Sequence, residues 1–437
     1  MNINLKQVIK NLSGICLDTL AKETGFVKSK AQKITPLYFV ASFFACVGRQ
    51  QISLSKWANA LMCLTGVSVS KEGLNKRLSA DRHADFCRGL LAKAMAAKAS
   101  SAMSRISRLG LEFNNIFLQD SSSLSLPKGC ELDFPGPHSN NGEKKATGKI
   151  QLTMDLLNDK PVDILLANFR KNDQGDALRI VDKLEQGDLL VRDLGYFVLR
   201  ALKAISSKGA YFLSRLKPSA HVYLPGQEVP FGLLEYCKAK KKAGAAQFEL
   251  AVEVGKKERV PVRLLVRQVP QGQYQKRRRK ALKDRHKSAN HNSHYLDMLQ
   301  WQFLVTNAEP EKISIAQAFV IYQLRWRIEI IFKAWKSGLK LQHMFAGLGH
   351  IKPARARAMI FLMLTYLVLF VYPAFQAIQQ KASKALSFMK WVNYLAANPL
   401  QNLQQLTEDI WVAHIERNCA YEVRRRKNHG DLISKLK

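Results

Sequence analysis

Three acidic residues stand where metal-dependent phosphodiester chemistry would need them. Asp120 follows an apolar run, IFLQ, Asp193 follows another, LLVR, and Glu329 lies in a stretch with helical periodicity. Ligands gather at the carboxyl ends of strands in an α/β sheet, so we expect the three carboxylates to converge there. Carboxylates in one cleft repel one another unless cations lie between them, and hard divalent ions take oxygen ligands. Two such ions can activate a water or hydroxyl and stabilise the leaving oxygen of a phosphodiester.

The helix that carries Glu329 is expected to present a polar face. Its start is predicted at Ser314–Gln317, whose residue types and spacing are those of a capping box. On one helix at about 100° per residue, four polar residues fall within roughly 60° of one another, namely Tyr322, Arg325, Glu329 and Lys336. Lys333 lies close to the same stripe. A neighbouring face should be buried, and it consists of Ile321, Leu324, Ile328, Ile331, Phe332, Trp335 and Leu339.

Glu329 with an arginine four residues before it also fits an ordinary surface ion pair. The two aspartates after apolar runs favour the catalytic interpretation instead, because they supply the other carboxylates that a metal centre needs. Arg325 and Lys336 can then hold phosphates beside the scissile one, and Tyr322 can donate to a phosphate or stack on a base.

The spacing Y-(2)-R-(3)-E-(6)-K formed by these residues is similar to the hallmark of bacterial insertion-sequence transposases of the IS-four group. The residues around Asp120, QDSS, and those around Asp193, DLGYF, are similar to the first and second acidic motifs of that group, in the same order. The resemblance covers the stretch from residue 110 to residue 350 and is most specific at the third motif.

The resemblance implies a ribonuclease-H-like catalytic core in which Asp120, Asp193 and Glu329 are the catalytic residues and bind Mg²⁺, with Mn²⁺ as a substitute and two ions in the site. It implies double-stranded DNA as partner, both the terminal inverted repeats and the target, and a homodimer that pairs two ends. In such enzymes the Tyr-Arg-Lys residues grip the transposon end and an aromatic residue holds a flipped base. Trp301 is the candidate for that last role, although an ordinary tryptophan buried in a strand is the favoured interpretation.

The charge balance also points to a polyanionic partner. The chain has 68 Lys and Arg against 34 Asp and Glu, a formal net charge of +34. Nucleic acid is the commonest such partner, with the ribosome or an anionic membrane as alternatives. The densest basic run includes Arg277, Arg278 and Arg279. We expect it to contact phosphates, while a merely solvated loop is the alternative.

The sequence divides into five regions by its texture. Residues 1–108 are predicted to be a helical DNA-binding region, 109–216 the first part of an α/β catalytic core, and 217–300 a β-rich basic insertion. Residues 301–375 are predicted to complete the core, and 376–437 to form a helical region that pairs subunits. In the first region, Leu54 to Leu64 and Ser70 to Leu78 fit a helix-turn-helix that carries Lys76 and Arg77, or equally an ordinary helical pair.

Within the core, alternation and apolar runs predict three strands followed by helix, strand, helix and strand, the order of a ribonuclease-H-like core. The expected strands are Ile116–Gln119, Lys149–Leu157, Val162–Phe169, Leu189–Arg192, Ala210–Ser214 and Trp301–Thr306, and the expected helices are Asp176–Gln186 and Val198–Ser206. The insertion is expected to hold a hairpin from Phe248 to Val269.

The remaining features bear on the compartment. Seven scattered cysteines without a C-x-x-C pair argue against a disulfide framework or a zinc site. The first residues lack the pattern of a secretory signal, so we expect a cytoplasmic protein that associates with the nucleoid when bound to DNA. Ala358 to Tyr372 is almost entirely apolar, and we expect a buried helix closed by Pro373, with no membrane partner.

The function favoured by these features is metal-dependent cutting of transposon ends and their transfer into target DNA. A ribonuclease-H-like nuclease that does not transpose is an alternative, as is a domesticated derivative that only binds DNA.

Overall fold

The computed structural model describes residues 10–12, 14–28, 34–47, 52–99, 112–138, 144–157, 160–284, 292–345, 348–397 and 408–421. The chain forms two compact units, each built from separate stretches of sequence. The first consists of Met1–Ser104, Ser121–Lys171 and Trp326–Asn428, and the second of Arg105–Asp120, Asn172–Arg325 and His429–Lys437. Asp120, Asp193, Tyr322 and Arg325 therefore belong to the second unit, whereas Glu329 belongs to the first.

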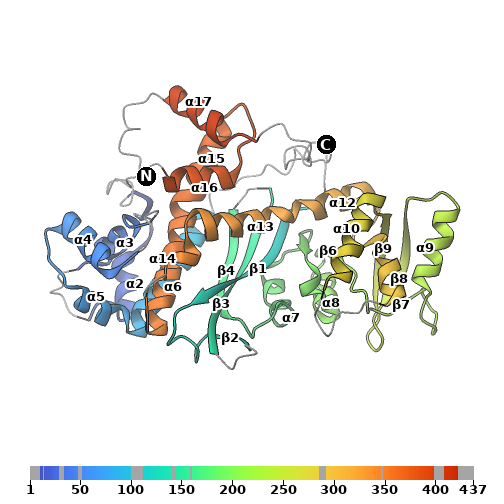
Figure 1. Ribbon diagram of the computed structural model, residues 1–437, viewed down its shortest axis with the longest axis horizontal. Helices are drawn as coiled ribbons and strands as arrows, with labels where there is room; N and C mark the ends of the chain where they lie inside the picture. The colour runs from blue at the N-terminus through green and yellow to red at the C-terminus, as the bar shows by residue number, and fades with distance from the viewer. Residues whose placement is uncertain are drawn as a thin grey trace. The chain divides into compact units, whose positions relative to one another are not determined.

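The second unit is built on a mixed sheet (Figure 1), in which β1 pairs in parallel with β5 and β5 in parallel with β6. The sheet continues through antiparallel neighbours in the order β6-β10-β9-β8-β7. The strands are β1 (Ile116–Leu126), β5 (Leu189–Arg192), β6 (Tyr211–Arg215), β7 (Val222–Tyr223), β8 (Gln247–Val254), β9 (Val260–Gln268) and β10 (Trp301–Thr306).

The helices of the second unit follow or separate these strands. They are α7 (Asp173–Asp176), the 3₁₀ turns η2 (Arg179–Lys183) and η3 (Leu194–Tyr196), α8 (Leu199–Ser207), α9 (Leu233–Lys242), α10 (Gln271–Leu282), α11 (Ser293–Met298) and α12 (Ile315–Leu324). The strands β5 and β10 have the bounds that the apolar runs predicted, and β8 and β9 form the predicted antiparallel hairpin. The basic run predicted to contact phosphates lies in α10.

Two expected elements of this unit are wrong in extent. β1 does not end at Gln119, its last residue paired with β5, but runs on to Leu126. The three serines after Asp120 are part of this extended strand. The helix expected over Asp176–Gln186 is replaced by α7 and η2. A physical reason is visible at Ala177, whose carbonyl accepts a hydrogen bond from the Arg192 guanidinium at 2.7 Å.

The first unit combines helices with three more strands, β2 (Pro135–His138), β3 (Lys144–Asp155) and β4 (Lys160–Asn168), paired antiparallel through β3. Its early helices are α2 (Leu17–Glu23), α3 (Pro36–Phe44), α4 (Leu54–Thr65), α5 (Lys71–Leu78) and α6 (Asp81–Ala99). α4 and α5 are the two helices predicted for a helix-turn-helix, and Gly66 ends α4 in the left-handed conformation at φ 70°.

The later helices of the first unit begin with α13 (Trp326–Lys333), the π turn η4 (Ala334–Gly338) and the 3₁₀ turn η5 (Leu341–His343). They continue with α14 (Pro353–Tyr366), the π turn η6 (Leu367–Val371), α15 (Tyr372–Lys381), α16 (Phe388–Ala397) and α17 (Glu408–Cys419). The apolar stripe predicted to be buried, from Ile321 through Leu339, is buried at every position.

The apolar stretch forms part of one long helix, Pro353–Lys381. Within the described residues this helix alone has the length and composition to cross a membrane. Its most apolar 18-residue window has a mean hydropathy of 2.2, and 89% of that window is buried inside the protein. The prediction that Pro373 closes the helix is wrong. The wider turn η6 precedes the proline, which lacks an N–H, and the helix continues as α15.

Candidate active site

Asp120 and Asp193 are placed side by side by the register of the parallel strands. Gln119 of β1 pairs with Arg192 of β5, and Arg192 pairs with Ser214 of β6. The residues that come next along the chain are Asp120, Asp193 and Arg215. They therefore form a row across three neighbouring strands, which are about 4.8 Å apart. Since successive residues of a strand point to opposite faces, these three side chains share one face.

The side chains on the reverse face form a buried polar layer. Gln119, Arg192 and Ser214 expose 0%, 1% and 1% of their surface. The Gln119 amide donates to the Asp176 carboxylate at 3.4 Å, and Arg179 donates to the same carboxylate at 2.7 Å. Burial lowers the pKa of Arg192 to about 9. This layer ties β1 and β5 to the chain that follows Asn172, directly behind the two aspartates.

The last turn of α12 and the residue that follows it supply a partner to each aspartate. The Tyr322 hydroxyl donates to Asp193 Oδ1 at 2.9 Å, and Arg325 Nη1 donates to Asp120 Oδ2 at 2.9 Å. Both residues are buried, with 8% and 9% of their surface exposed. The prediction that Tyr322 and Arg325 share one helix face therefore holds, and that face lies over the row of aspartates.

Tyr322 is held in its protonated form. Burial, and next the negative charge of Asp193, raise the pKa of the Tyr322 phenol above its ordinary value of 10.0. A neutral phenol donates its hydrogen to the carboxylate, which matches the observed contact.

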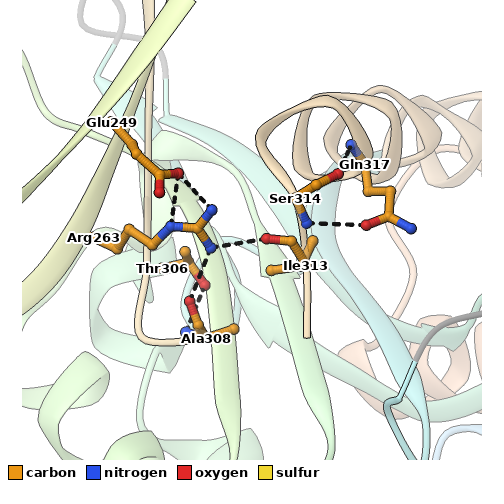
Figure 2. A network of polar contacts seen from close by, with 7 residues as sticks. All are labelled: Glu249, Arg263, Thr306, Ala308, Ile313, Ser314 and Gln317. Carbon is orange, nitrogen blue, oxygen red and sulfur yellow. Dashed lines mark hydrogen bonds and ion pairs between the residues drawn. The ribbon is translucent and has the colours of Figure 1, made fainter. Parts of the chain in front are cut away.

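The start of α12 is fixed by a polar network that links it to the sheet (Figure 2). The predicted capping box is present: Ser314 Oγ accepts from the Gln317 N–H, and the Gln317 side chain accepts from the Ser314 N–H. Just before it, Arg263 of β9 donates to the backbone carbonyls of Ala308 and Ile313, at 3.2 and 2.8 Å.

The same Arg263 guanidinium is paired with Glu249 of β8, at 2.5 and 2.9 Å. The chain between β10 and α12 is thus anchored on two strands through one side chain. The anchor fixes the start of the helix whose last turn carries Tyr322 and whose C-terminal end is followed by Arg325, the two residues that meet the aspartates.

The single helix expected from Ser314 to Leu339 is wrong in its regularity. At Arg325 the backbone tightens, since its N–H donates to the Tyr322 carbonyl three residues back, and α12 ends at Leu324. A π turn spans Lys336. The rotation of about 100° per residue therefore does not continue to Lys336. The prediction that Lys336 shares one helix face with Tyr322 and Arg325, which assumed that rotation, does not apply there.

The other predicted helix residues lie in the first unit. Glu329 is in the first turn of α13 and is half-buried. Lys333 ends α13 and is exposed, whereas Lys336 in η4 is half-buried, and this burial lowers its pKa.

The predicted DNA-contacting residues outside this helix differ in exposure. Arg278 and Arg279 on α10 are exposed, but Arg277 is half-buried and donates to the Trp301 carbonyl at 3.3 Å. Trp301 is 3% exposed and packs edge-on against Phe248, as a buried strand tryptophan would.

On α5, Lys76 is exposed and Arg77 is half-buried over the Phe26 ring, at 5.5 Å. Only Lys76 of this pair is presented to solvent.

Sequence reasoning missed Arg215, Arg267 and the buried layer around Arg192. A signal existed for Arg215, because it follows an apolar strand run just as the two aspartates do. Arg267 had none, since its neighbours come from β10 and α12: its guanidinium donates to the Gln302 amide oxygen at 3.1 Å and lies 4.0 Å from the centre of the Phe319 ring.

The pair of aspartates fits a hard divalent cation. Both offer carboxylate oxygens on neighbouring strands, and both are already positioned by a cationic or hydrogen-bonding partner, Tyr322 of α12 or Arg325 directly after it. Among the residues that the structure describes, no group of three or more His, Cys, Asp or Glu side chains is close enough to hold a metal. All seven cysteines are free thiols.

Comparison with known proteins gives a consistent result. The chain is 28% identical over 355 residues to the transposase for insertion sequence element IS231B of Bacillus thuringiensis subsp. berliner, which covers 77% of this chain and 73% of the relative. It is 28% identical over 425 residues to the IS231F transposase of Bacillus thuringiensis subsp. israelensis, covering 90% and 86%.

Among solved structures, the piggyBac transposase synaptic complex with hairpin DNA aligns over 98% of this chain and 86% of that chain. Its sequence identity is 10% and its TM-score 0.43, a similarity too low to define the fold. The family described as Transposase DDE domain matches residues 112–369. Because this match spans more than half of its residues, the chain belongs to the transposase DDE domain family.

Proposed function

We propose that this chain is an insertion-sequence DDE transposase of the IS-four group that cuts transposon ends and joins them to target DNA. The observation that carries the proposal is the row across the parallel strands, where Asp120 and Asp193 lie next to each other and bind Arg325 and Tyr322. Two adjacent carboxylates with a buried arginine beside them suit a site where divalent cations and phosphates meet.

The strand arrangement supports a ribonuclease-H-like core. β3 and β4 are antiparallel neighbours, β3 is hydrogen-bonded to β1, and β5 and β6 follow as parallel neighbours. Apart from the short strand β2 between β1 and β3, the order of three strands and then two parallel ones separated by helices agrees with that expected for such a core.

Asp120, Asp193 and Glu329 would hold the metal, Mg²⁺ with Mn²⁺ as substitute and two ions in number. When bound, the ions supply activation of the attacking oxygen and stabilisation of the leaving oxygen. Tyr322 orients the Asp193 carboxylate through its hydroxyl, and Arg325 fixes Asp120. Arg325, Lys333 and Lys336 hold phosphates of the transposon end beside the scissile one.

The partners follow from this reaction. They are double-stranded DNA, as terminal inverted repeats and as target, and a second copy of the chain to bring two ends together. The helical region before residue 108 binds the ends, with Lys76 exposed on α5, and the region after 376 pairs subunits. The protein works in the cytoplasm on the nucleoid. In this proposal, water frees a 3′-hydroxyl at each end and this hydroxyl attacks a target phosphate.

The test is cleavage of DNA that carries the inverted repeats flanking the gene, in Mg²⁺. Asp120→Asn should abolish cleavage and strand transfer, because the amide offers one neutral oxygen in place of a carboxylate. Asp182→Asn is the matched control: this aspartate is exposed in η2 of the same unit and should leave both reactions unchanged.

Cleavage that persists in Asp120→Asn would remove this residue from the site and overturn the proposal. Cutting that ignores the repeat sequence and yields no joined product would instead indicate a nuclease that does not transpose.

A further inference from the structure

The face of the sheet that carries the aspartates continues with arginines. Arg215 of β6 lies beside Asp193 in the row and pairs with Leu304 of the next strand, β10. Two residues away on β10, Gln302 pairs with Arg267 of β9. Residues two apart on a strand share a face, so Arg215 and Arg267 lie on the face of Asp193. The contact of Arg267 with Phe319 of α12 places that helix over the same face.

A third arginine reaches this place from α10. Arg277 donates to the carbonyl of Trp301, the residue next to Gln302. After burial, the largest cause, the charge of Arg215 lowers the pKa of Arg277, and the charge of Arg277 lowers that of Arg267. Arg277 is therefore near enough to repel both Arg215 and Arg267.

Two other arginines of this unit are neutralised by a carboxylate. Arg263, four residues before Arg267 on β9, is paired with Glu249, and Arg179 is paired with Asp176. Within the ranges that the structure covers, the contacts of Arg267 and Arg277 are to an amide oxygen and a carbonyl, and no ion pair forms at either or at Arg215. Arg267 and Arg277 are half-buried and Arg215 is exposed, and like charges that are partly buried cost free energy unless an anion joins them.

We propose that Arg215, Arg267 and Arg277 together bind one backbone phosphate of the DNA strand next to Asp193. The inference rests on the proposed function and adds a phosphate subsite to it. Guanidinium groups hold phosphate oxygens in pairs of parallel hydrogen bonds, and three of them from β6, β9 and α10 surround one anion. A phosphate fixed here sets which phosphodiester of the strand reaches the aspartates.

The subsite also divides the basic helix α10 by role. Arg277 is turned toward the sheet, while Arg278 and Arg279 are exposed to solvent. Only Arg277 then acts at a fixed position on the strand, and its exposed neighbours contribute to long-range attraction.

The test compares Arg215→Gln and Arg277→Gln with Arg200→Gln. Arg200 is an exposed arginine on α8 of the same unit, so the control removes the same charge by the same substitution. Binding of a duplex transposon end is measured from low to high salt, and cleavage is measured in Mg²⁺. Each subsite variant should lower the slope of log affinity against log salt by about 1 and slow cleavage by about tenfold or more. Arg200→Gln should match the wild type in both.

One further variant and one further probe complete the experiment. Arg277→Lys keeps the charge without the planar fork, so it should retain the salt slope and still cleave slowly, and thermal denaturation verifies that each variant is folded. Inorganic phosphate, used as a second probe, distinguishes a free anion from the DNA backbone. The proposal is overturned if Arg215→Gln and Arg277→Gln bind and cut the duplex like Arg200→Gln, or if they change only the response to inorganic phosphate.

The outcome is separable from that of the proposed function. Asp120→Asn should lose cleavage and keep the wild-type salt slope. Persistent cleavage in that variant contradicts the catalytic proposal, whereas unaltered subsite variants contradict the phosphate subsite alone.

Discussion

The guanidinium of Arg325 lies 2.9 Å from a carboxylate oxygen of Asp120, and the two side chains expose 11% and 17% of their surface. Asp120 is one of the three residues that are proposed to hold a divalent cation. In the absence of metal, Arg325 therefore supplies the positive charge at Asp120, and a metal ion that enters must share the carboxylate with it or displace it.

Replacing Arg325 should accordingly tighten metal binding in the protein without DNA. Arg325→Gln removes the competing charge, and we expect its affinity for Mn²⁺ to rise about fivefold, the equivalent of about 1 kcal/mol for a partly exposed pair. The same variant should bind the transposon end more weakly. Calorimetric titration with Mn²⁺ measures the first effect. Arg325→Lys keeps the charge and serves as control; unchanged or weaker Mn²⁺ binding by Arg325→Gln would contradict the competition.

Removing the Tyr322 hydroxyl should slow the reaction without changing its pH dependence. Tyr322→Phe deletes the hydrogen bond to Asp193, and we expect cleavage to fall about tenfold, as for the loss of one hydrogen bond to a charged group. Because the pKa of Tyr322 is raised, the phenol stays protonated below and just above pH 10.0. Rates between pH 7 and 10 should give parallel profiles for both proteins; a falling limb present only in the wild type would contradict this.

The buried histidine of the N-terminal helices should make the first unit sensitive to acid. His83 is 1% exposed against Phe26, and burial first, then the charges of Arg77 and Arg82, lower its pKa from 6.5 to about 4. Between these values the unfolded chain binds the proton and the folded one does not. The free energy of unfolding should therefore decrease as pH falls from 7 to 4, by about 3 kcal/mol in full.

Urea denaturation at pH 7 and at pH 4.5 measures this loss. His83→Phe keeps a ring against Phe26 and carries no titratable group, so its stability should depend less on pH over that interval. Equal losses in the two proteins would show that other groups cause the acid sensitivity.

The network in Figure 2 should matter for both stability and catalysis. Arg263→Met leaves Glu249 and the carbonyls of Ala308 and Ile313 without their donor, at a cost of about 2 kcal/mol. Thermal denaturation should show a lower midpoint, and cleavage should slow because the start of α12 is loosened. Lys238→Met, which removes an exposed ion pair with Asp297, should melt near the wild type. Equal midpoints in the two variants would argue against an anchoring role.

Local sequence predicted those elements whose residues agree with their surroundings. The apolar runs gave the bounds of β5 and β10, and the capping box at Ser314 marked the start of α12. The positions of Asp120 and Asp193 directly after apolar runs were sufficient to place them side by side on neighbouring parallel strands, although β1 continues past Asp120 and only Asp193 follows the end of its strand.

The failures occur where distant residues decide the local backbone. α12 ends beside Arg325, whose side chain binds an aspartate 205 positions earlier. The helix expected after Asp176 shortens where Arg192 takes the carbonyl of Ala177. Arg267 was missed because its surroundings come from β10 and α12. Such contacts have no periodic signature along the chain.

The long apolar helix Pro353–Lys381 has a consequence for biosynthesis. Its first part, α14, contacts α3, α5 and α6, all of which precede it in the chain. These three helices have therefore left the ribosome before α14 emerges. A nascent chain can enclose this stretch as it appears, which shortens the time in which so apolar a segment could be taken up by membrane-insertion machinery or by other nascent chains.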